Sequence, residues 1–295
     1  MTERMPVAAP TGAGDLLRVD DLSVEFRTAG GVARVVDDLS FAVPRGGALG
    51  IVGESGSGKS MTSLAIMGLL PKGGAATGSV SFDGRDLLTL PGREMRQVRG
   101  DRIAMIFQDP LSSLNPYYTV GTQIAEAYLS HRSGVSKKAA RRVAIEAMER
   151  VHIRDAANRV DHYPHQFSGG MRQRIMIAMA LSMEPELIIA DEPTTALDVT
   201  VQAQILDLLA EIRRDTGAGL ILITHDLAVV SEVTEQIVVM RGGRLVERGS
   251  VEDVFSDPQE EYTRRLLDAV PRIDDTIGEL RTTAIPVVSD EEENA

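Results

Sequence analysis

Eight consecutive residues have the types and the spacing of a phosphate-binding loop. They match the pattern G-x-x-x-x-G-K-[ST] at every fixed position, as Gly53-Glu54-Ser55-Gly56-Ser57-Gly58-Lys59-Ser60. Glycines let backbone N–H groups turn toward phosphate oxygens, and the positive end of a following helix adds to the attraction. We expect Lys59 to reach the β- and γ-phosphates, Ser60 to ligate Mg²⁺ through its hydroxyl, and Met61 to complete the site. This segment, called the phosphate loop below, predicts that the chain binds a nucleoside triphosphate.

Two acidic residues, Asp191 and Glu192, follow the apolar run Leu187-Ile188-Ile189-Ala190. A strand that ends in a carboxylate can place it beside the Mg²⁺ of a phosphate-loop site. We therefore expect Asp191 to hold the metal through water, and Glu192 to act as the general base that polarises the attacking water. The alternative is an ordinary strand end, closed by a turn at Asp-Glu-Pro, without a catalytic role.

A second glycine-rich segment, Ser168-Gly169-Gly170, comes directly before a helical pattern. A helix N-terminus of this kind can bind an anion for the same reason as the first. One nucleotide does not need two such sites from a single chain. We therefore expect a head-to-tail dimer, in which Ser168, Gly169 and Gly170 of each chain face the phosphate loop of the other. Standing alone, the segment would be a serine N-cap followed by two turn glycines.

A strand and a helix must flank the phosphate loop if the pattern is to carry this meaning. Residues 48–52 precede the loop as an apolar, buried strand, and residues 61–70 follow it with helical periodicity. Residues 16–26 and 32–43 alternate in the manner of strands, and residues 78–84 predict one more short strand. An antiparallel β layer is therefore expected beside the nucleotide-binding core.

The remaining chain alternates strands with helices. Helices are expected at 120–130, at 137–151 after a Ser136 cap, at 170–183, and around 201–212. Strands are expected at 102–107, as a central strand, and at 187–190 and 220–224, with a closing hairpin at 237–247. The methionines of the 170–183 helix are expected to pack in the core. This order predicts an α/β fold whose parallel-sheet core is interrupted by a helical subdomain of about residues 109–185.

The composition is typical of a soluble globular protein, since 43% of the 295 residues are hydrophobic and 25% are charged. A formal net charge of -12 disfavours nucleic acid as a partner. The chain has no cysteine, which excludes disulfides and thiolate metal sites. No apolar run approaches the ~18 residues of a transmembrane helix, so another chain would have to span any membrane involved. Residues 1–14 and the acidic residues 271–295 are expected to be flexible tails.

In combination these motifs resemble the ATP-binding cassette (ABC) ATPases, over roughly residues 16–249. The segment Phe167-Ser168-Gly169-Gly170-Met171 is similar to the family signature Leu-Ser-Gly-Gly-Gln. The resemblance implies a P-loop NTPase (RecA-like) core, with ATP and Mg²⁺ as cofactors. It also implies roles for four more residues: Gln108 as the Q-loop glutamine that senses Mg²⁺ and couples to a membrane partner, Asp198 as the D-loop residue that reaches across the dimer, His225 as the switch histidine at the γ-phosphate, and Phe26 as the aromatic ring stacked on adenine.

Three longer segments, residues 108–116, 163–171 and 257–267, resemble the oligopeptide and dipeptide importer branch of this family. Met171 in the signature is typical of the first-type ATPase subunit. The resemblance implies a peripheral subunit on the cytoplasmic face of the cell membrane, with a second and different ATP-binding subunit, two permease subunits and a substrate-binding protein as partners. Many members carry an iron–sulfur cluster on cysteines, which this chain cannot build. Glu260-Glu261 also departs from the His-Pro of the family. Nickel and sugar remain open as alternative cargoes.

Two other classes of protein remain as alternatives. A non-transport ABC ATPase acting on DNA or ribosomes would carry a long coiled coil between phosphate loop and signature, or a second cassette, and the sequence has neither. A P-loop kinase would leave Ser168-Gly169-Gly170 and His225 without a role. The sequence therefore predicts an ATP-hydrolysing subunit of an importer, with no nucleic acid partner.

Overall fold

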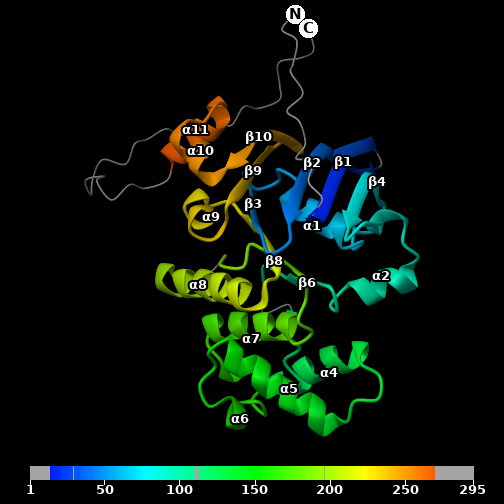
Figure 1. Ribbon diagram of the computed structural model, residues 1–295, viewed down its shortest axis with the longest axis vertical. Coiled ribbons are helices and arrows are strands. Elements are labelled where there is room, and N and C mark those ends of the chain that lie inside the picture. Colours follow the sequence, from blue (N-terminus) through cyan, green and yellow to red (C-terminus); the bar gives the residue numbers. More distant parts are fainter. Residues whose placement is uncertain (1–13, 29, 110–112, 196, 270–295) are drawn as a thin grey trace, which may run out of the picture.

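The computed structural model describes residues 14–28, 30–109, 113–195 and 197–269, and a six-stranded sheet lies at its centre (Figure 1). The strands follow the order β10-β9-β3-β8-β7-β6. Their bounds are β3 (Ala48–Val52), β6 (Ile103–Ile106), β7 (Leu187–Asp191), β8 (Gly219–Thr224), β9 (Gln236–Arg241) and β10 (Arg244–Ser250). Neighbouring strands pair in parallel, except for the antiparallel hairpin of β9 and β10. Every residue of β3, β7 and β8 is buried, which explains their continuous apolar sequences.

Strand β6 corrects one prediction. The sequence predicts a central strand at residues 102–107, and this is wrong, because β6 lies at one edge of the sheet, beside β7. Helix α7 (Gly169–Leu181) packs against β6, and Ala104 and Ile106 are buried. A covering helix makes an edge strand as apolar as a central one, so hydrophobicity could not distinguish the two positions.

An antiparallel sheet of four strands, in the order β2-β1-β4-β5, lies beside the central sheet and confirms the predicted β layer. Its strands are β1 (Asp15–Thr28), β2 (Gly31–Pro44), β4 (Gly74–Phe82) and β5 (Arg85–Asp86). Strand β4 begins four residues before the predicted start at Gly78. Gly78 has a φ of 97°, and a Cβ there would lie 2.4 Å from the carbonyl oxygen of Asp21, at an irregularity in the β1–β4 pairing. The glycine lies inside β4, opposite a bulge in β1, and does not mark the beginning of the strand.

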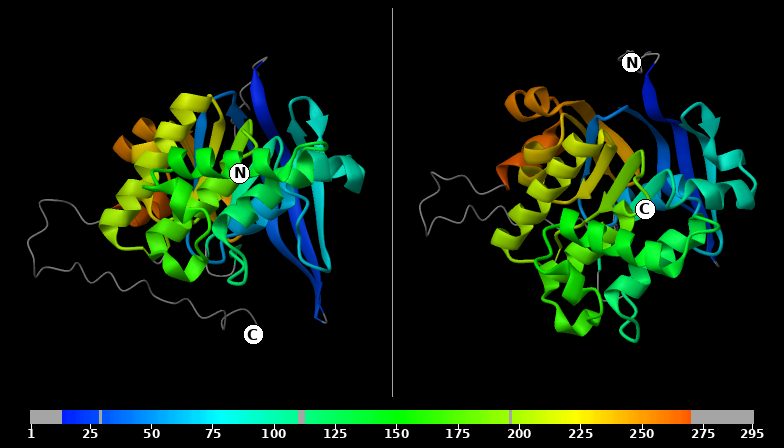
Figure 2. Two further views of the ribbon diagram at one scale, coloured as in Figure 1. Left: turned by 90° about the horizontal axis from the view of Figure 1, so that it is seen from below. Right: turned by 60° about the horizontal axis from the view of Figure 1, so that its bottom comes forward.

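The helices gather mainly on the other side of the central sheet (Figure 2). They are α1 (Lys59–Ile66), α2 (Gly92–Val98), α4 (Val120–His131), α5 (Lys137–Arg150), α6 (Ala156–Arg159), α7, α8 (Val199–Thr216), α9 (Leu227–Val233), α10 (Val251–Ser256) and α11 (Glu261–Asp268), with short 3-10 helices η1 (Leu87–Thr89) and η2 (Pro164–Gln166). Helix α5 begins after Ser136, whose Oγ accepts from the N–H of Ala139, as predicted. Helices α4 to α7 fall within the predicted helical subdomain, whose limits remain a prediction. The predicted tails, residues 1–14 and 271–295, lie outside the described residues except for Gly14.

No helix within the described ranges is both long and apolar enough to cross a membrane.

Two hydrophobic clusters fix the central sheet from its two faces. Ile188 and Leu222 pack with the helical layer, whereas Ile189 and Ile223 pack toward the antiparallel sheet. This division follows from the alternation of side chains along a strand. Strands β3, β7 and β8 run parallel and therefore end at the same edge of the sheet, where the chain continues into the candidate site residues.

Candidate nucleotide-binding site

The phosphate loop joins β3 to α1, the context that its sequence pattern requires. Gly53 and Gly58 have φ values of 153° and 98°. A Cβ on Gly53 would lie 2.2 Å from the carbonyl oxygen of Met240, and one on Gly58 would lie 2.6 Å from that of Val35. Both obstacles are backbone atoms, so only glycine fits these positions. Helix α1 begins within the loop, at Lys59, and the N–H groups of its first turn have no partner inside the helix, which makes them available to an anion.

Lys59 is buried inside this loop, with 4% of its surface exposed. Its Nζ donates to the carbonyl oxygens of Gly53, at 2.6 Å, and Glu54, at 2.8 Å. Burial lowers the pKa of Lys59, and the nearby carboxylates of Glu192 and Asp191 oppose that change. The ammonium group therefore spans the loop, close to two acidic groups.

Asp191 lies at the end of β7 and faces the first turn of α1. The Oγ of Ser60 donates to its Oδ1 at 3.0 Å, and the Oγ of Ser63 donates to its Oδ2 at 3.4 Å. Burial raises the pKa of Asp191, and the two serine hydroxyls partly counteract this. The predicted pair of Ser60 and Asp191 is thus brought together by the structure. Ser63 lies one helical turn after Ser60 and was not predicted from the sequence, since the loop pattern ends at Ser60.

Glu192 is held by three side chains that arrive from three different segments. Its Oε2 accepts from the Nε2 of Gln108, at 3.1 Å, and from the Oγ1 of Thr195, at 2.9 Å. The Nδ1 of His225 lies 3.5 Å from the same oxygen. Gln108 follows β6, Thr195 follows β7 and His225 follows β8, so the parallel strands deliver all three to one edge. The structure therefore brings together Gln108, Glu192 and His225, which the sequence predicts to belong to one site.

The backbone of Glu192 has a left-handed conformation, with a φ of 47°, and its N–H donates to the carbonyl oxygen of Ile223 at 2.8 Å. A left-handed conformation is uncommon for a residue other than glycine and is typical of functional sites. It turns the chain sharply after Asp191, so that the two acidic groups meet different partners. Thr195 is the one residue of this cluster that the sequence motifs do not indicate, and its position three residues after Glu192 is the signal that the sequence offers for it.

Ser168 forms the N-cap of α7, and its Oγ accepts from the N–H of Met171 at 3.4 Å. Ser168 and Gly169 are exposed. Figure 1 shows α7 within the lower helical layer, whereas α1 lies beside β1 in the upper part of the molecule. A Cβ built on Gly169 would lie 3.8 Å from the side chain of Leu197, and one built on Gly170 would lie 2.5 Å from the side chain of Val201. The structure thus places the second glycine-rich segment against the start of α8, apart from the phosphate loop of its own chain.

Asp198 and Phe26 have local roles in the described chain. Asp198 is exposed and caps α8, since its Oδ1 accepts from the N–H of Val201 at 3.0 Å. Ala196, which precedes it in the predicted D-loop, lies outside the described residues. Phe26 is half-buried in β1, and its ring lies 2.8 Å from a Cβ built on Gly74. That Phe26 contacts adenine remains a prediction, and so does the contact of Asp198 with a second subunit.

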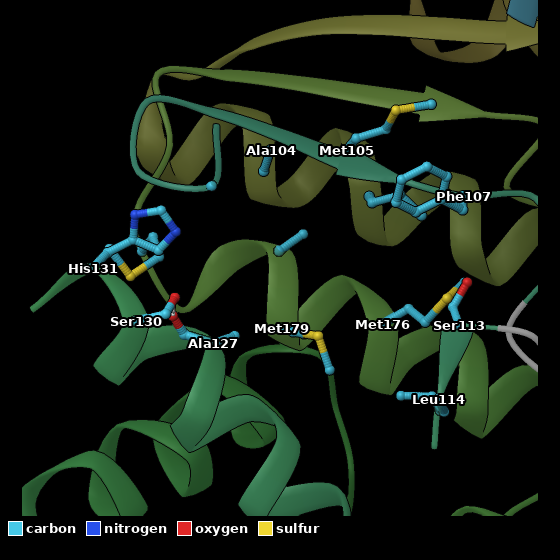
Figure 3. Close-up of a pocket in the computed structure, with 14 residues that line it drawn as sticks. Ala104, Met105, Phe107, Ser113, Leu114, Ala127, Ser130, His131, Met176 and Met179 are labelled. Atoms are coloured by element: carbon cyan, nitrogen blue, oxygen red, sulfur yellow. Dashed lines mark hydrogen bonds between the residues drawn. The ribbon is translucent and has the colours of Figure 1, made fainter. Parts of the chain in front are cut away.

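A groove of about 290 Å³ lies beside the segment that leads to Gln108 (Figure 3). Met105 and Phe107 line it on one side, and Met176 and Met179 of α7 line it on the other. Met176 is also part of the core, as the sequence predicts, yet its side chain reaches the groove. Phe107, next to Gln108, is 43% exposed, which leaves an apolar surface directly beside the glutamine.

Comparison with known proteins agrees with this arrangement. Residues 36–195, which include the phosphate loop, Asp191 and Glu192, match the ABC transporter family. The chain belongs to this family. It is 51% identical over 274 residues to the oligopeptide transport ATP-binding protein OppD of Salmonella typhimurium, covering 93% of this chain and 82% of that protein. It is 52% identical over 261 residues to the dipeptide transport ATP-binding protein DppD of Bacillus subtilis, covering 88% and 78%.

Solved structures of ABC cassettes are similar as well. The dimeric cassette MJ0796, in a post-hydrolysis state bound to ADP and Pi, matches with a TM-score of 0.70 at 26% identity, covering 80% of this chain and 98% of that one. The ABC resemblance, the peptide-importer branch and the fold class predicted from the sequence are confirmed by these comparisons.

Proposed function

We propose that this chain is the ATP-hydrolysing subunit of an importer for oligopeptides or dipeptides. The observation that carries the proposal is the Glu192 carboxylate, held by Gln108, Thr195 and His225 beside the phosphate loop. A carboxylate fixed in this way can orient and deprotonate a water molecule for attack on a γ-phosphate. The peptide cargo is supported by the OppD and DppD relatives, and nickel or sugar remain the alternatives.

The phosphate loop is proposed to bind ATP. The N–H groups at the start of α1 and the ammonium group of Lys59 would neutralise the β- and γ-phosphates. His225 is 58% exposed at its side chain and can therefore turn from Glu192 toward a γ-phosphate. Phe26 is proposed to stack on the adenine ring.

Mg²⁺ fits the residues at the end of β7. Ser60 and Asp191 offer the hydroxyl and carboxylate oxygens that this ion prefers, and they already lie in contact. Across the described ranges, the acidic and histidine side chains form no group of three that could hold a metal by themselves. This agrees with an ion held mainly by phosphate and water oxygens, with Gln108 near it. When bound, the ion would neutralise charge on the transferred phosphoryl group.

A second ATP-binding subunit is proposed to complete the site. Ser168 and Gly169 are exposed at the N-terminus of α7, and the glycines do not contact the phosphate loop of their own chain. In a head-to-tail pair, each chain would offer this helix end to the nucleotide of the other. The dimeric arrangement of the MJ0796 cassette supports such a pair. We propose further that the second subunit is a different chain, as in the peptide-importer branch.

The membrane partners are proposed to be two permease subunits, served by a substrate-binding protein. The apolar groove beside Gln108 provides a surface on which a permease segment could act, because movement there would reach Glu192 through a single hydrogen bond. The chain would then work at the cytoplasmic face of the cell membrane, where ATP is available.

The substitution Glu192→Gln tests this proposal. It keeps the size of the side chain but removes the base, so ATP binding should persist while steady-state hydrolysis in the assembled transporter falls by about 100-fold or more. Glu232→Gln, an exposed change on α9, serves as the matched control and should keep full activity. Hydrolysis by the Glu192→Gln transporter at the wild-type rate would show that another group is the base.

A further inference from the structure

Helix α11 reaches the phosphate loop through one side chain. The Oη of Tyr262, on this helix, accepts a hydrogen bond from the N–H of Glu54 at 3.3 Å. Tyr262 lies 208 positions further along the chain than Glu54, and only 9% of its surface is exposed. The contact therefore joins the C-terminal part of the described chain to the first residues of the loop.

The same residue of the loop is held from both sides. The carbonyl oxygen of Glu54 accepts from the Nζ of Lys59 at 2.8 Å, while its N–H is bonded to Tyr262. Lys59 is the side chain proposed to neutralise the β- and γ-phosphates. A change in the position of the Glu54 backbone would therefore move a hydrogen-bond partner of Lys59.

The position of Tyr262 is itself fixed by packing. Its ring belongs to a cluster with Val52 and Val239, and Val52 is the last residue of β3 before the loop. The guanidinium carbon of Arg241 lies 4.9 Å from the ring centroid, a favourable cation–π distance. Burial raises the pKa of Tyr262, so its hydroxyl stays protonated and neutral at physiological pH. A rigid, neutral hydroxyl is thus presented to the loop.

A second hydrogen bond, from the turn between β9 and β10, also holds the backbone of the phosphate loop. The N–H of Gly243, in the turn between β9 and β10, donates to the carbonyl oxygen of Ser57 at 3.1 Å. Backbone groups of Glu54 and Ser57 are therefore both bonded to elements that follow β9 in the chain. This leaves the N–H groups at the start of α1 to face a bound anion.

We infer that Tyr262 is a positioning residue for nucleotide binding, which holds the Glu54 backbone so that the phosphate loop is ordered before ATP arrives. The inference rests on the proposed function, because it assumes that this loop binds the nucleotide. Tyr262 acts through Glu54 and Lys59 and does not touch the reacting atoms. Binding to a pre-ordered loop avoids the entropy cost of ordering it, so the hydroxyl contributes to affinity rather than to the chemical step.

The substitution Tyr262→Phe removes only the hydroxyl and keeps the ring that packs beside Val52 and Arg241. Loss of one hydrogen bond of this kind should weaken nucleotide binding by about three- to tenfold. The KM for ATP should rise to a similar extent, with kcat unchanged, because Glu192 and its three partners keep their positions. The melting temperature should stay close to that of the wild type, since the buried ring remains.

The test uses the full-length chain and a fluorescent ATP analogue that carries an N-methylanthraniloyl group. Its dissociation constant is measured for the wild type and for Tyr262→Phe, Tyr128→Phe and Lys59→Ala, together with thermal unfolding by circular dichroism. Tyr128, half-buried on α4, is the matched control and should bind like the wild type. Steady-state hydrolysis in the assembled transporter then separates KM from kcat.

The outcomes separate this inference from the proposal beneath it. If Lys59→Ala abolishes binding and Tyr262→Phe weakens it as expected at an unchanged melting temperature, the positioning role is supported. If Lys59→Ala abolishes binding but Tyr262→Phe binds within twofold of the wild type, Tyr262 only packs α11 against the core, and the inference is wrong. If Lys59→Ala binds the analogue as well as the wild type, the proposed nucleotide site itself fails, and the inference with it.

Discussion

The close approach of α7 to α8 makes Gly170 the most informative position for a substitution. A Cβ built on Gly170 would lie 2.5 Å from the Cγ1 of Val201, which is about 1 Å less than the 3.4 Å at which ordinary contacts begin. Val201 is β-branched and sits in a helix, so its side chain has one strongly preferred rotamer and little freedom to turn away. The substitution Gly170→Ala must therefore push the two helices apart.

The expected size of the effect follows from this geometry. Overpacking by one methyl group costs about 1–3 kcal/mol. Replacing a glycine by alanine in a helix returns roughly 0.5–1 kcal/mol. The net destabilisation should lie between about 0 and 2.5 kcal/mol, with a centre near 1 kcal/mol, and 1 kcal/mol lowers the melting temperature of a domain of this size by roughly 2–4 °C.

A double-mutant cycle with Val201→Ala measures the contact directly. The smaller side chain makes room for the new methyl group, so Gly170→Ala and Val201→Ala together should be about 1–2 kcal/mol more stable than the sum of the single changes predicts. Gly169→Ala is the matched control, because its Cβ would lie 3.8 Å from Leu197 and its φ is not positive. Urea unfolding of the four variants and the wild type provides the free energies. Strict additivity of the two changes would refute the reasoning, because it would show that the new methyl group does not press on Val201.

Two further predictions follow from the phosphate site. Burial raises the pKa of Asp191 above its ordinary 3.8, so the folded chain binds more protons than the unfolded one, and this contribution to stability is lost as the pH rises through the raised pKa. Asp191→Asn should therefore gain stability relative to the wild type from acidic to neutral pH in urea titrations without Mg²⁺; an opposite slope would contradict the assignment. Gly53→Ala should lower the free energy of unfolding by more than about 2 kcal/mol and abolish nucleotide binding, because its Cβ would collide with the carbonyl oxygen of Met240. Thermal unfolding and nucleotide titration measure the two effects, and a variant that matches the wild type in both would contradict this prediction.

Local sequence patterns predict most of the fold, because strands and helices differ in the period of their apolar residues and helices begin at recognisable N-cap residues. The apolar runs of β3, β7 and β8 are buried strands, and Ser136 and Ser168 begin helices as their types suggest. The edge position of β6 could not be predicted in this way, because burial by α7 and burial between two strands select the same apolar residues. Sheet order depends on contacts between distant segments, which hydrophobicity does not record.

The candidate site divides in the same manner. Residues within motifs, such as Lys59 and Asp191, were predicted with their neighbours, because the spacing within a motif is part of the pattern. Thr195 and Tyr262 are not predicted as site residues, since each acts on a motif residue through a single hydrogen bond. Tyr262 lies in the segment 257–267 that resembles the peptide importers, but that resemblance assigns it no contact with the phosphate loop. Contacts of this kind become visible only when the ends of the parallel strands and α11 are placed in space.

Some glycines of the chain are required by contacts within the fold, whereas Gly169 is not. Gly53 and Gly58 are required by backbone atoms of their own chain, and Gly170 by Val201. Gly169 has neither a positive φ nor a close neighbour, and it is exposed at the end of α7. Nothing in the described chain therefore explains why position 169 should lack a side chain. The requirement is met if a second subunit brings its nucleotide against this helix end, which is the arrangement that the proposed function needs.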